Sequence, residues 1–592
     1  MFLVAIGRRR LLPVIDGSRR LELVAGRWHV TALAAGPLAH VDDTGTLLTV
    51  TERPLSRAGA AAPELAEVAF DPTRHRLDVR RQPRGGRLVY YTVTPDGDFL
   101  CATHVWLLRR AGIPIQERRT ALPEFFVYCY VMAPATMFEN IHQVPYGGSL
   151  RVDLDEGGLK VTASSGCDFL DRAVHREAVP DADLGRTALD FLSEAVRPLG
   201  ATQGRVTTLL SGGVDSSLLA RLADRLLGTR ETYSTSYPFE DDASNAEKEY
   251  PITAATALGM CHRHHEPTTA EYLDAVLSAI AAVEQPLHGL QTPLLAALFT
   301  HGIAEGVSVL LCGEGADNYL GVQIHEEIFQ GRRGLRVGRH LARRPIVHAF
   351  RLLSRLTWKA YAFRARLERW QALLRPVDDP EHPLWEDERY GDPAWARSYF
   401  GVASDVIIEN RLRALRPFLD RDLLDVVSIL ALLGSTSAVQ GLWSRLADAT
   451  GRALVFPFTE ATLMGYAFGI PWERKLASPK HLARLMSRQA GVPEFILDRP
   501  KSGFGIHARR WAMRGGPLEP LVPLAVKVVP ESLIRAVQRP PDTTSRIYWN
   551  LLNYALWKRL VVDGEPLETL RGELADSVGS CSRSDGGTCR SP

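Results

Sequence analysis

The feature that most constrains this chain is the short run SGGVDSS at residues 211–217. It follows the β-prone run VTTLL and precedes a leucine-patterned stretch that predicts a helix over residues 217–227. A strand that ends in glycines and passes into a helix is the usual geometry for holding phosphate. The glycines let backbone N–H groups approach the anion, and the helix N-terminus adds partial positive charge. A helix capped by Ser211 or Asp215 is the plain alternative, but the full string at a strand end favours a phosphate site.

The loop belongs to neither of the two commonest phosphate-binding classes. It lacks the lysine of GxxxxGK[ST], so it is not a Walker A loop, and it lacks the GxGxxG spacing of dinucleotide binders. A second break of the same kind occurs in VSVLLCGEGADNYLG at residues 307–321, where a β-prone run ends in glycines and carboxylates. Alone, this second segment reads as a solvated surface turn. Paired with the first loop about 100 residues upstream, it indicates a shared site.

Together the two segments resemble the class B asparagine synthetase family, a group of N-type ATP pyrophosphatases. The resemblance implies acyl-adenylate chemistry: a carboxylate attacks the α-phosphate of ATP, pyrophosphate leaves, and an amine then displaces AMP. It implies ATP and Mg²⁺ as cofactors, with Asp215 and Asp317 as metal ligands and Glu314 handling the proton of the attacking amine. Asn318 replaces the family's usual glutamate. The residues expected to bind ATP or pyrophosphate are Leu209, Ser211, Gly212, Gly213, Asp215, Ser216, Ser217, Thr235 and Gly313.

Two further segments resemble elements of the same family. RPKSGFGIH at residues 499–507 resembles R-x-K-x-x-F, which makes Lys501 the catalytic lysine that stabilises charge built up during adenylation and amine attack. The family's R-x-P-F-L-D element has two candidates, RPFLD at 416–420 and VFPFTE at 455–460. The second lies at a better distance before Lys501 and is preferred. The family arginine then becomes Val455, which indicates an altered acceptor pocket.

The arrangement of the chain predicts two domains of α/β and α+β class. Residues 1–178 contain short β-like runs and resemble, faintly, the glutaminase domain of the family, an Ntn-type β-rich sandwich. In residues 179–575 strands alternate with helices, which predicts a parallel-sheet ATP-pyrophosphatase synthetase domain, and a mostly helical extension follows from about residue 327. Residues 576–592 are polar and are expected to be a disordered tail.

The second residue of the chain separates this protein from a glutamine-using enzyme. A working glutaminase in this family needs a cysteine directly after the initiator methionine. Phe2 stands there, and the first cysteine is Cys101. We therefore expect a degenerate glutaminase-like domain, kept as a structural partner, and an amine that does not come from glutamine.

Four functions remain open on this reading. The preferred one is a lasso peptide cyclase, which adenylates an Asp or Glu side chain of a precursor peptide and joins it to the peptide's own N-terminal amine as a macrolactam. The others are a β-lactam synthetase-like ligase, an ammonia-dependent asparagine synthetase, and a catalytically inactive scaffold. Retention of Asp215, Glu314, Asp317 and Lys501 together disfavours the scaffold.

Composition bears on location and partners. A formal net charge of +2 gives no global attraction to nucleic acid or membrane. The start MFLVAIGRRR is the reverse of a secretory signal, no uncharged apolar run reaches membrane-spanning length, and seven cysteines form no CxxC pair, so a cytoplasmic enzyme without membrane insertion is expected.

One local charge excess points to a partner. Residues 331–375 hold twelve arginines and one acid, Glu368, among apolar and aromatic residues. Docking of an acidic peptide or partner protein is preferred there over a solvated basic face or a nucleic-acid or membrane contact. The expected partners are a ribosomal precursor peptide, with a leader peptidase and a leader-peptide-binding protein of the same pathway.

Overall fold

The computed structural model describes most of the chain. The described residues are 1–8, 18–44, 47–54, 64–172, 180–237, 242–321, 323–338, 368–369, 372–373, 375–386, 389–499, 515–538 and 544–584. Lys501 and most of the arginine-rich stretch 331–375 lie outside them.

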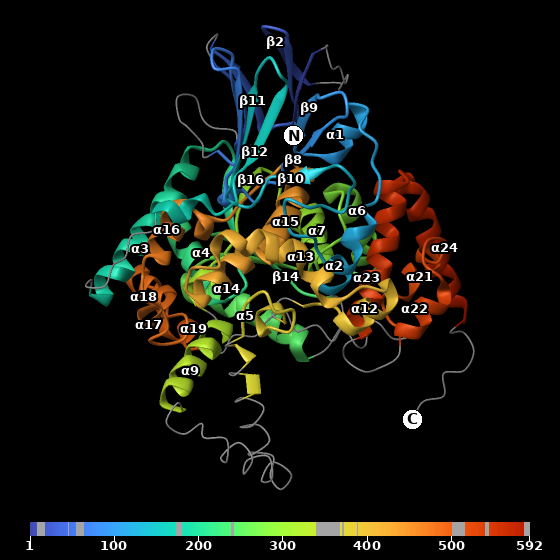
Figure 1. The fold of residues 1–592 in the computed structure, drawn as a ribbon. Coiled ribbons are helices and arrows are strands. Elements are labelled where there is room, and N and C mark those ends of the chain that lie inside the picture. The colour runs from blue at the N-terminus through green and yellow to red at the C-terminus, as the bar shows by residue number, and fades with distance from the viewer. Residues whose placement is uncertain are drawn as a thin grey trace.

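The N-terminal region is a sandwich of two antiparallel sheets, drawn at the top of Figure 1. One sheet has the order β10-β8-β9-β1-β3-β2 and the other β12-β11-β7-β6-β5-β4. The strands are β1 (Phe2–Gly7), β2 (Arg19–Ala25), β3 (Trp28–Ala34), β4 (Ala39–Asp43), β5 (Leu48–Glu52), β6 (Ala66–Asp71), β7 (Arg76–Arg81), β8 (Tyr90–Val93), β9 (Phe99–Ala102), β10 (His142–Gln143), β11 (Ser149–Leu154) and β12 (Leu159–Ala163).

Alternation of side chains explains why these strands pack as two layers. In β6, β7 and β11 every second residue is buried, as expected where one face of a strand covers a core. Phe2, Val4 and Ile6 from one sheet pack with Val68 and Val152 from the other in a shared apolar cluster. The predicted β-rich sandwich is therefore confirmed.

The second domain is built on a five-stranded parallel sheet with the order β15-β14-β13-β16-β17. Its strands are β13 (Arg205–Leu209), β14 (Glu231–Thr235), β15 (Cys261–His265), β16 (Val307–Leu311) and β17 (Ala453–Val455). The chain runs from β13 outward to β15 and then returns to place β16 on the other side of β13. In sheets of this kind ligands bind outside the carboxyl ends of the strands where the order reverses, here between β13 and β16.

Helices connect and cover this sheet, as the alternation in the sequence predicts. The crossovers are α4 (Val214–Leu227), α5 (Asp242–Leu258), α6 (Thr269–Val283) and α7 (Gln291–Ala297). The other α-helices bounded within the described residues are α1 (Val105–Arg110), α2 (Leu122–Tyr128), α3 (Asp181–Val196), α8 (Asp317–Leu320), α9 (Gln323–Gly338), α12 (Pro393–Phe400), α13 (Ser404–Leu415), α14 (Leu423–Ala431), α15 (Ser437–Ala449), α16 (Ala461–Phe468), α17 (Trp472–Lys475), α18 (His481–Ala490), α19 (Glu494–Leu497), α21 (Val522–Ala525), α22 (Glu531–Val537), α23 (Thr544–Trp557) and α24 (Leu567–Ser584). The helical extension after β16 is confirmed.

Two details qualify the sequence-based picture. Helix α24 continues to Ser584, so residues 576–584 are helical rather than part of a disordered tail. The composition of the tail hid this, because the buried Leu570 and Leu574 that anchor the helix lie before the polar stretch. Within the described residues, the run Leu423–Ala449 is long and apolar enough to span a membrane, but 72% of its apolar window is buried inside the protein.

Candidate active site

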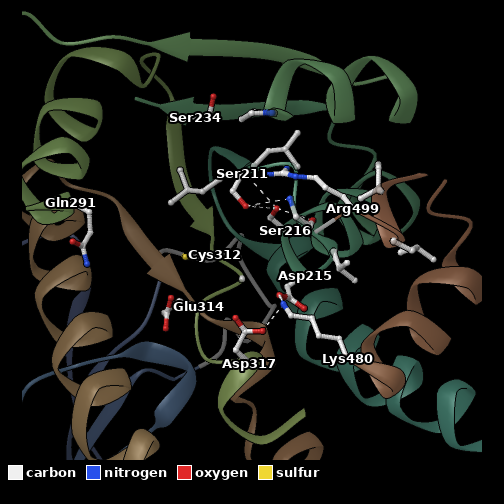
Figure 2. Close-up of a pocket in the computed structure, with 18 of the residues that line it drawn as sticks. Ser211, Asp215, Ser216, Ser234, Gln291, Cys312, Glu314, Asp317, Lys480 and Arg499 are labelled. Atoms are coloured by element: carbon white, nitrogen blue, oxygen red, sulfur yellow. Dashed lines mark hydrogen bonds and ion pairs between the residues drawn. The ribbon is translucent and has the colours of Figure 1, made fainter. Parts of the chain in front are cut away.

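The first glycine-rich loop closes tightly against a neighbouring helix. Gly212 has a φ of +74°, and a Cβ there would lie 2.5 Å from the carbonyl oxygen of Tyr250, so only glycine fits. The Ser211 and Ser216 hydroxyls lie 3.1 Å apart, and Ser216 donates to the Gly213 carbonyl at 3.2 Å. Figure 2 shows these hydroxyls together at the start of α4, where the helix N-terminus favours an anion.

The second turn lies directly beside the first. A Cβ on Gly313 would lie 3.3 Å from the backbone nitrogen of Ser216, so the two loops approach at van der Waals distance. The backbone N–H of Cys312 donates to the carbonyl of Val455 at 3.0 Å, which attaches the turn to β17. Helix α8 begins at Asp317, and its carboxylate points toward Asp215 across the gap (Figure 2). The parallel sheet thus brings together two loops that are a hundred residues apart.

The loops enclose a cavity of about 950 Å³, at the upper end of the usual range for small-molecule sites. The predicted residues that line it are Leu209, Ser211, Gly213, Asp215, Ser216, Thr235, Gly313, Glu314 and Asp317. Of the predicted residues that the structure describes, Gly212 and Ser217 lie just behind the lining: Gly212 forms the bend, and Ser217 is fully buried in α4. Lys501 lies outside the described residues, and the chemical roles of all these residues remain predictions.

A lysine that the sequence analysis missed occupies the centre of the site. Lys480 Nζ lies 2.6 Å from a carboxylate oxygen of Asp215 and 2.5 Å from one of Asp317 (Figure 2). Burial alone would lower the pKa of Lys480, but the two carboxylates outweigh it and raise that pKa above its usual value. One signal could have found this residue. A lysine just before an amphipathic helix opposes the helix dipole, and such an unfavourable placement points to another role.

The two carboxylates fit the divalent cation that the resemblance noted in the sequence implies. One ammonium contacts both of them, so it stands in for a cation that they could share. Among the described residues, no group of three or more histidine, cysteine or acidic side chains is gathered to hold a metal. Two carboxylates match a magnesium ion that takes its remaining ligands from water and from the phosphates of a nucleotide.

Two arginine side chains line the same cavity. Arg499 donates from Nη1 to the Gly212 carbonyl at 3.3 Å, and its guanidinium lies 3.0 Å from the centre of the Tyr250 ring. Arg484 also lines the cavity. Both cations lie where they could meet a polyphosphate. Arg499 belongs to the R-P-K element, and so the part of that element which the structure describes does reach the site.

The turn around Glu314 is held by contacts with Thr436 and Thr459 of the second domain. Asn318, which departs from the family pattern, donates from its side-chain amide to the Thr436 hydroxyl. A carboxylate at this position could not donate such a bond. Thr459 of the VFPFTE segment packs against Gly315, so this segment lies beside the turn. Burial raises the pKa of Cys312 to about 12, with Glu314 acting in the same direction, so the thiol in this turn stays protonated.

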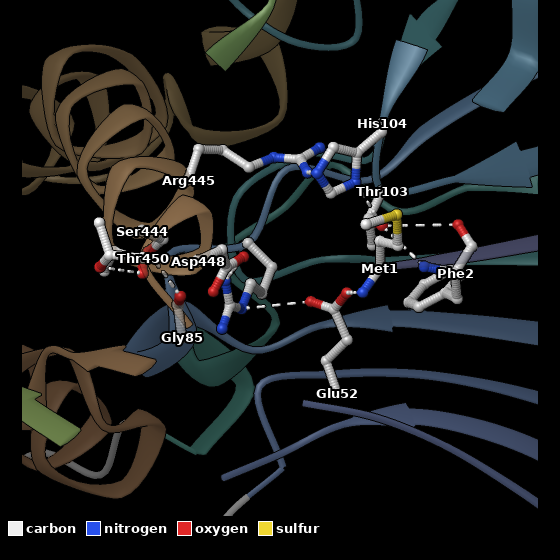
Figure 3. Close-up of polar contacts among 12 residues, drawn as sticks. Met1, Phe2, Glu52, Gly85, Thr103, His104, Ser444, Arg445, Asp448 and Thr450 are labelled. Carbon is white, nitrogen blue, oxygen red and sulfur yellow. Dashed lines mark hydrogen bonds and ion pairs between the residues drawn. The ribbon is translucent and has the colours of Figure 1, made fainter. Parts of the chain in front are cut away.

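The corner of the first domain where a glutaminase would place its nucleophile is filled. Phe2 is 1% exposed, and its backbone N–H donates to the Thr103 hydroxyl at 2.9 Å. The N-terminal ammonium lies 3.1 Å from Glu52 (Figure 3). Cys101 lies on β9, which pairs with the strand β1 that holds Phe2. It is fully buried, and burial raises its pKa to about 12. A protonated, buried thiol is a poor nucleophile.

Comparisons with known proteins agree with this geometry. The family description "Asparagine synthase" matches residues 187–527. Proteins described as putative glutamine-hydrolysing asparagine synthetases from *Mycobacterium tuberculosis* and *Mycobacterium bovis* are 24% identical over 530 residues, covering 83% of this chain and 76% of theirs. Glutamine-hydrolysing asparagine synthetase 1 of *Bacillus subtilis* is 22% identical over 457 residues, covering 75% of this chain and 68% of its own. Since the family description spans more than half of its residues, the chain belongs to the asparagine synthase family.

Proposed function

We propose that this protein is a peptide macrolactam synthetase, or lasso peptide cyclase. Family membership makes it an ATP-dependent, amide-forming ligase. The observation that carries the adenylating chemistry is the meeting of the two glycine-rich loops, with Asp215 and Asp317 both in contact with Lys480. In the proposal the carboxylate is an Asp or Glu side chain of a ribosomal precursor peptide, and the amine is that peptide's N-terminus.

The residues of the site can divide the work as follows. The backbone N–H groups of the first loop and the hydroxyls of Ser211 and Ser216 hold the pyrophosphate that leaves. Lys480 balances charge on the polyphosphate, and a magnesium ion held by Asp215 and Asp317 would polarise the phosphates. Glu314, which lines the cavity, accepts the proton of the attacking amine. Lys501 remains the predicted stabiliser of charge built up in both half-reactions.

The wall opposite the phosphate loop supports a peptide over free aspartate. The described lining residues of α7 and α15 are Gln291, Leu294, Leu295 and Trp443, none of which carries a charge. A free amino acid would need groups that neutralise both its α-amino and its α-carboxylate charges. The indole N–H of Trp443 is buried with no hydrogen-bond partner among the described residues, so it could donate to a peptide carbonyl.

A second candidate is favoured by a different observation. The relatives named above are described as asparagine synthetases, which supports aspartate as the acceptor, with ammonia in place of glutamine because the first domain has no nucleophile at Phe2. The β-lactam synthetase-like alternative has the same site chemistry with a smaller substrate. A leader peptidase, a leader-peptide-binding protein and a cytoplasmic location belong to the cyclase proposal.

The test uses purified protein with ATP and magnesium, and nucleotide products are separated by chromatography. One reaction contains the peptide encoded beside this reading frame, together with its processing proteins. Another contains aspartate and ammonium. The cyclase proposal expects AMP and a peptide lighter by one water in the first reaction only. AMP with asparagine in the second would replace the proposal with the second candidate, and ADP with phosphate as stoichiometric products would overturn adenylation altogether.

A further inference from the structure

One helix of the second domain lies between the first domain and the active site. The face of α15 that meets the first domain carries residues spaced three or four apart, as one side of a helix requires. Its residues Ser437, Gln440, Gly441, Ser444, Arg445 and Asp448 contact, respectively, Arg81, Tyr146, Leu88, Gly85, His104 and Arg87 of the first domain. Figure 3 shows the end of this row, where Ser444, Arg445 and Asp448 face the strands.

The contact nearest the active site is a relay of three residues. The Tyr146 hydroxyl, from the loop after β10, donates to Gln440 Oε1 at 2.9 Å. Gln440 Nε2 donates in turn to the backbone carbonyl of Glu314 at 3.2 Å. Tyr146 and Gln440 are both fully buried, so the bond between them is shielded from solvent, whereas the bond to Glu314 is partly buried beside the cavity. A hydroxyl of the first domain therefore fixes which way the Gln440 amide faces, and the amide holds the turn that carries Glu314.

The turn has little freedom to relax if this relay is broken. Gly315 has a φ of +98°, and a Cβ there would lie 2.4 Å from Thr459 Cγ2 and 3.0 Å from Gln440 Nε2. The peptide after Glu314 is thus pressed against Gln440. If the amide turned over, its oxygen would face the Glu314 carbonyl, and two acceptors would be left in contact inside the protein.

We propose that Tyr146 is a positioning residue for the adenylation site and that it acts through Gln440 on the turn carrying Glu314. The glutaminase-like domain is then part of the synthetase site, which explains its retention without a nucleophile. This inference rests on the proposed role of Glu314, but the coupling between Tyr146 and the turn does not depend on which acceptor the enzyme uses.

The test compares two tyrosines of the first domain whose hydroxyls donate to different parts of the second domain. Tyr146→Phe removes the relay. Tyr128→Phe is the matched control, because the Tyr128 hydroxyl is also buried and also donates across to the second domain, at 3.1 Å to the Trp385 carbonyl, away from the cavity. Thermal unfolding of both variants measures the shared structural cost of one buried hydrogen bond.

Two readouts separate positioning from stability. Hydrogen exchange by mass spectrometry should show faster exchange in peptides covering residues 312–321 in Tyr146→Phe and not in Tyr128→Phe. In the full reaction, Tyr146→Phe should lower kcat about tenfold with KM for ATP changed by less than about twofold, as expected when one net hydrogen bond acts only on the reacting geometry. Gln440→Glu, which keeps an acceptor for Tyr146 but loses the donor, should reproduce both effects.

The result that overturns the proposal is equal exchange in residues 312–321 and equal kcat for the two tyrosine variants. If the wild-type protein forms no AMP with any acceptor, the proposed function fails. The exchange comparison still decides the coupling, since it needs neither substrate nor turnover.

Discussion

Two charged clusters in this protein are built in opposite ways. In the first domain, Glu52 and Arg87 are each 1% exposed, and Arg87 contacts both Glu52, at 3.3 Å, and Asp448 of the second domain. In the second domain, Lys480 bridges two carboxylates beside an open cavity. The first cluster is buried where the two domains meet, whereas the second lines a cavity of about 950 Å³.

The difference separates a buried structural contact from a cluster that borders a binding cavity. Burial alone would raise the pKa of the Glu52 carboxyl, but the N-terminal ammonium and Arg87 outweigh it and lower that pKa to about 2. The Glu52 carboxyl is therefore ionised throughout the physiological pH range, as expected for a carboxylate that holds two segments together. At the cavity, the ammonium of Lys480 and the carboxylates of Asp215 and Asp317 border a space that a ligand can enter. Buried pairs that span two domains hold those domains together, and pairs that border a cavity serve binding.

The largest expected effect comes from the cluster of Lys480, Asp215 and Asp317 beside the cavity. Asp215→Asn and Asp317→Asn should each lower the rate of pyrophosphate release at least about a thousandfold, or about 4 kcal/mol of barrier, because each removes a metal ligand and a partner of Lys480. Release is measured by a coupled phosphate assay, with circular dichroism to confirm the fold. Turnover near the wild-type rate in either variant would show that this cluster is structural too.

The buried cluster of Glu52, Arg87 and Asp448 should affect the free energy of unfolding instead. Arg87→Met leaves Glu52 and Asp448 buried without their shared cation, so the free energy of unfolding should fall by about 3 kcal/mol or more. Arg84→Met is the control: Arg84 also pairs across the domains, with Glu460 at 2.7 Å, but both side chains are about one fifth exposed. It should cost about 1 kcal/mol or less. Urea unfolding measures both, and equal losses would contradict the contrast between fixed and exposed pairs.

A smaller effect should follow pH. Lys475 is buried with its ammonium 3.5 Å from the centre of the Trp472 ring, and burial lowers its pKa from 10.5 to about 7 although Asp425 and Asp422 oppose the shift. Between pH 7 and 10.5 the unfolded chain binds a proton there that the folded protein does not. Stability should therefore rise with pH in this window, by about 1.4 kcal/mol per unit.

Replacement of Lys475 tests this sign directly. Lys475→Met should flatten the rise of unfolding free energy between pH 7 and 10. Lys558→Met, at a partly exposed lysine paired with Asp563, should leave it in place. A wild-type protein that loses stability over the same window would show that Lys475 is held charged.

The smallest expected effect is none at all. Glutamine should release no glutamate, because the corner at Phe2 is filled and the Cys101 thiol is buried and protonated. A coupled glutamate assay measures this, with the glutamine-hydrolysing enzyme of *Bacillus subtilis* as the positive control. Glutamate formed by this protein would mean that the first domain has kept a catalytic site, and the comparison between the two clusters would have to be redrawn.

Local patterns were enough to predict the framework of the site. Glycines at a strand end and a helix that follows at once are written in a few consecutive residues, so Asp215 and Asp317 could be placed on two loops before the fold was known. The parallel sheet then confirmed that these loops meet. Lys480 was missed because the residues around it do not indicate its partners, Asp215 and Asp317, which lie 265 and 163 residues away in the sequence. The helical start of the predicted tail was missed because α24 is anchored by leucines outside that stretch.

By itself, the sequence determined the family and the two-domain fold, and it predicts a first domain without a glutaminase nucleophile, because each depends on residues that are neighbours along the chain. Only the tertiary structure decided what holds the site in place. Lys480 between two carboxylates, and Tyr146 reaching Glu314 through Gln440, join residues far apart in the sequence. The first contact arises where α18 packs against α4 and α8, and the second arises where α15 packs against the first domain. No periodicity in a single segment encodes either of them.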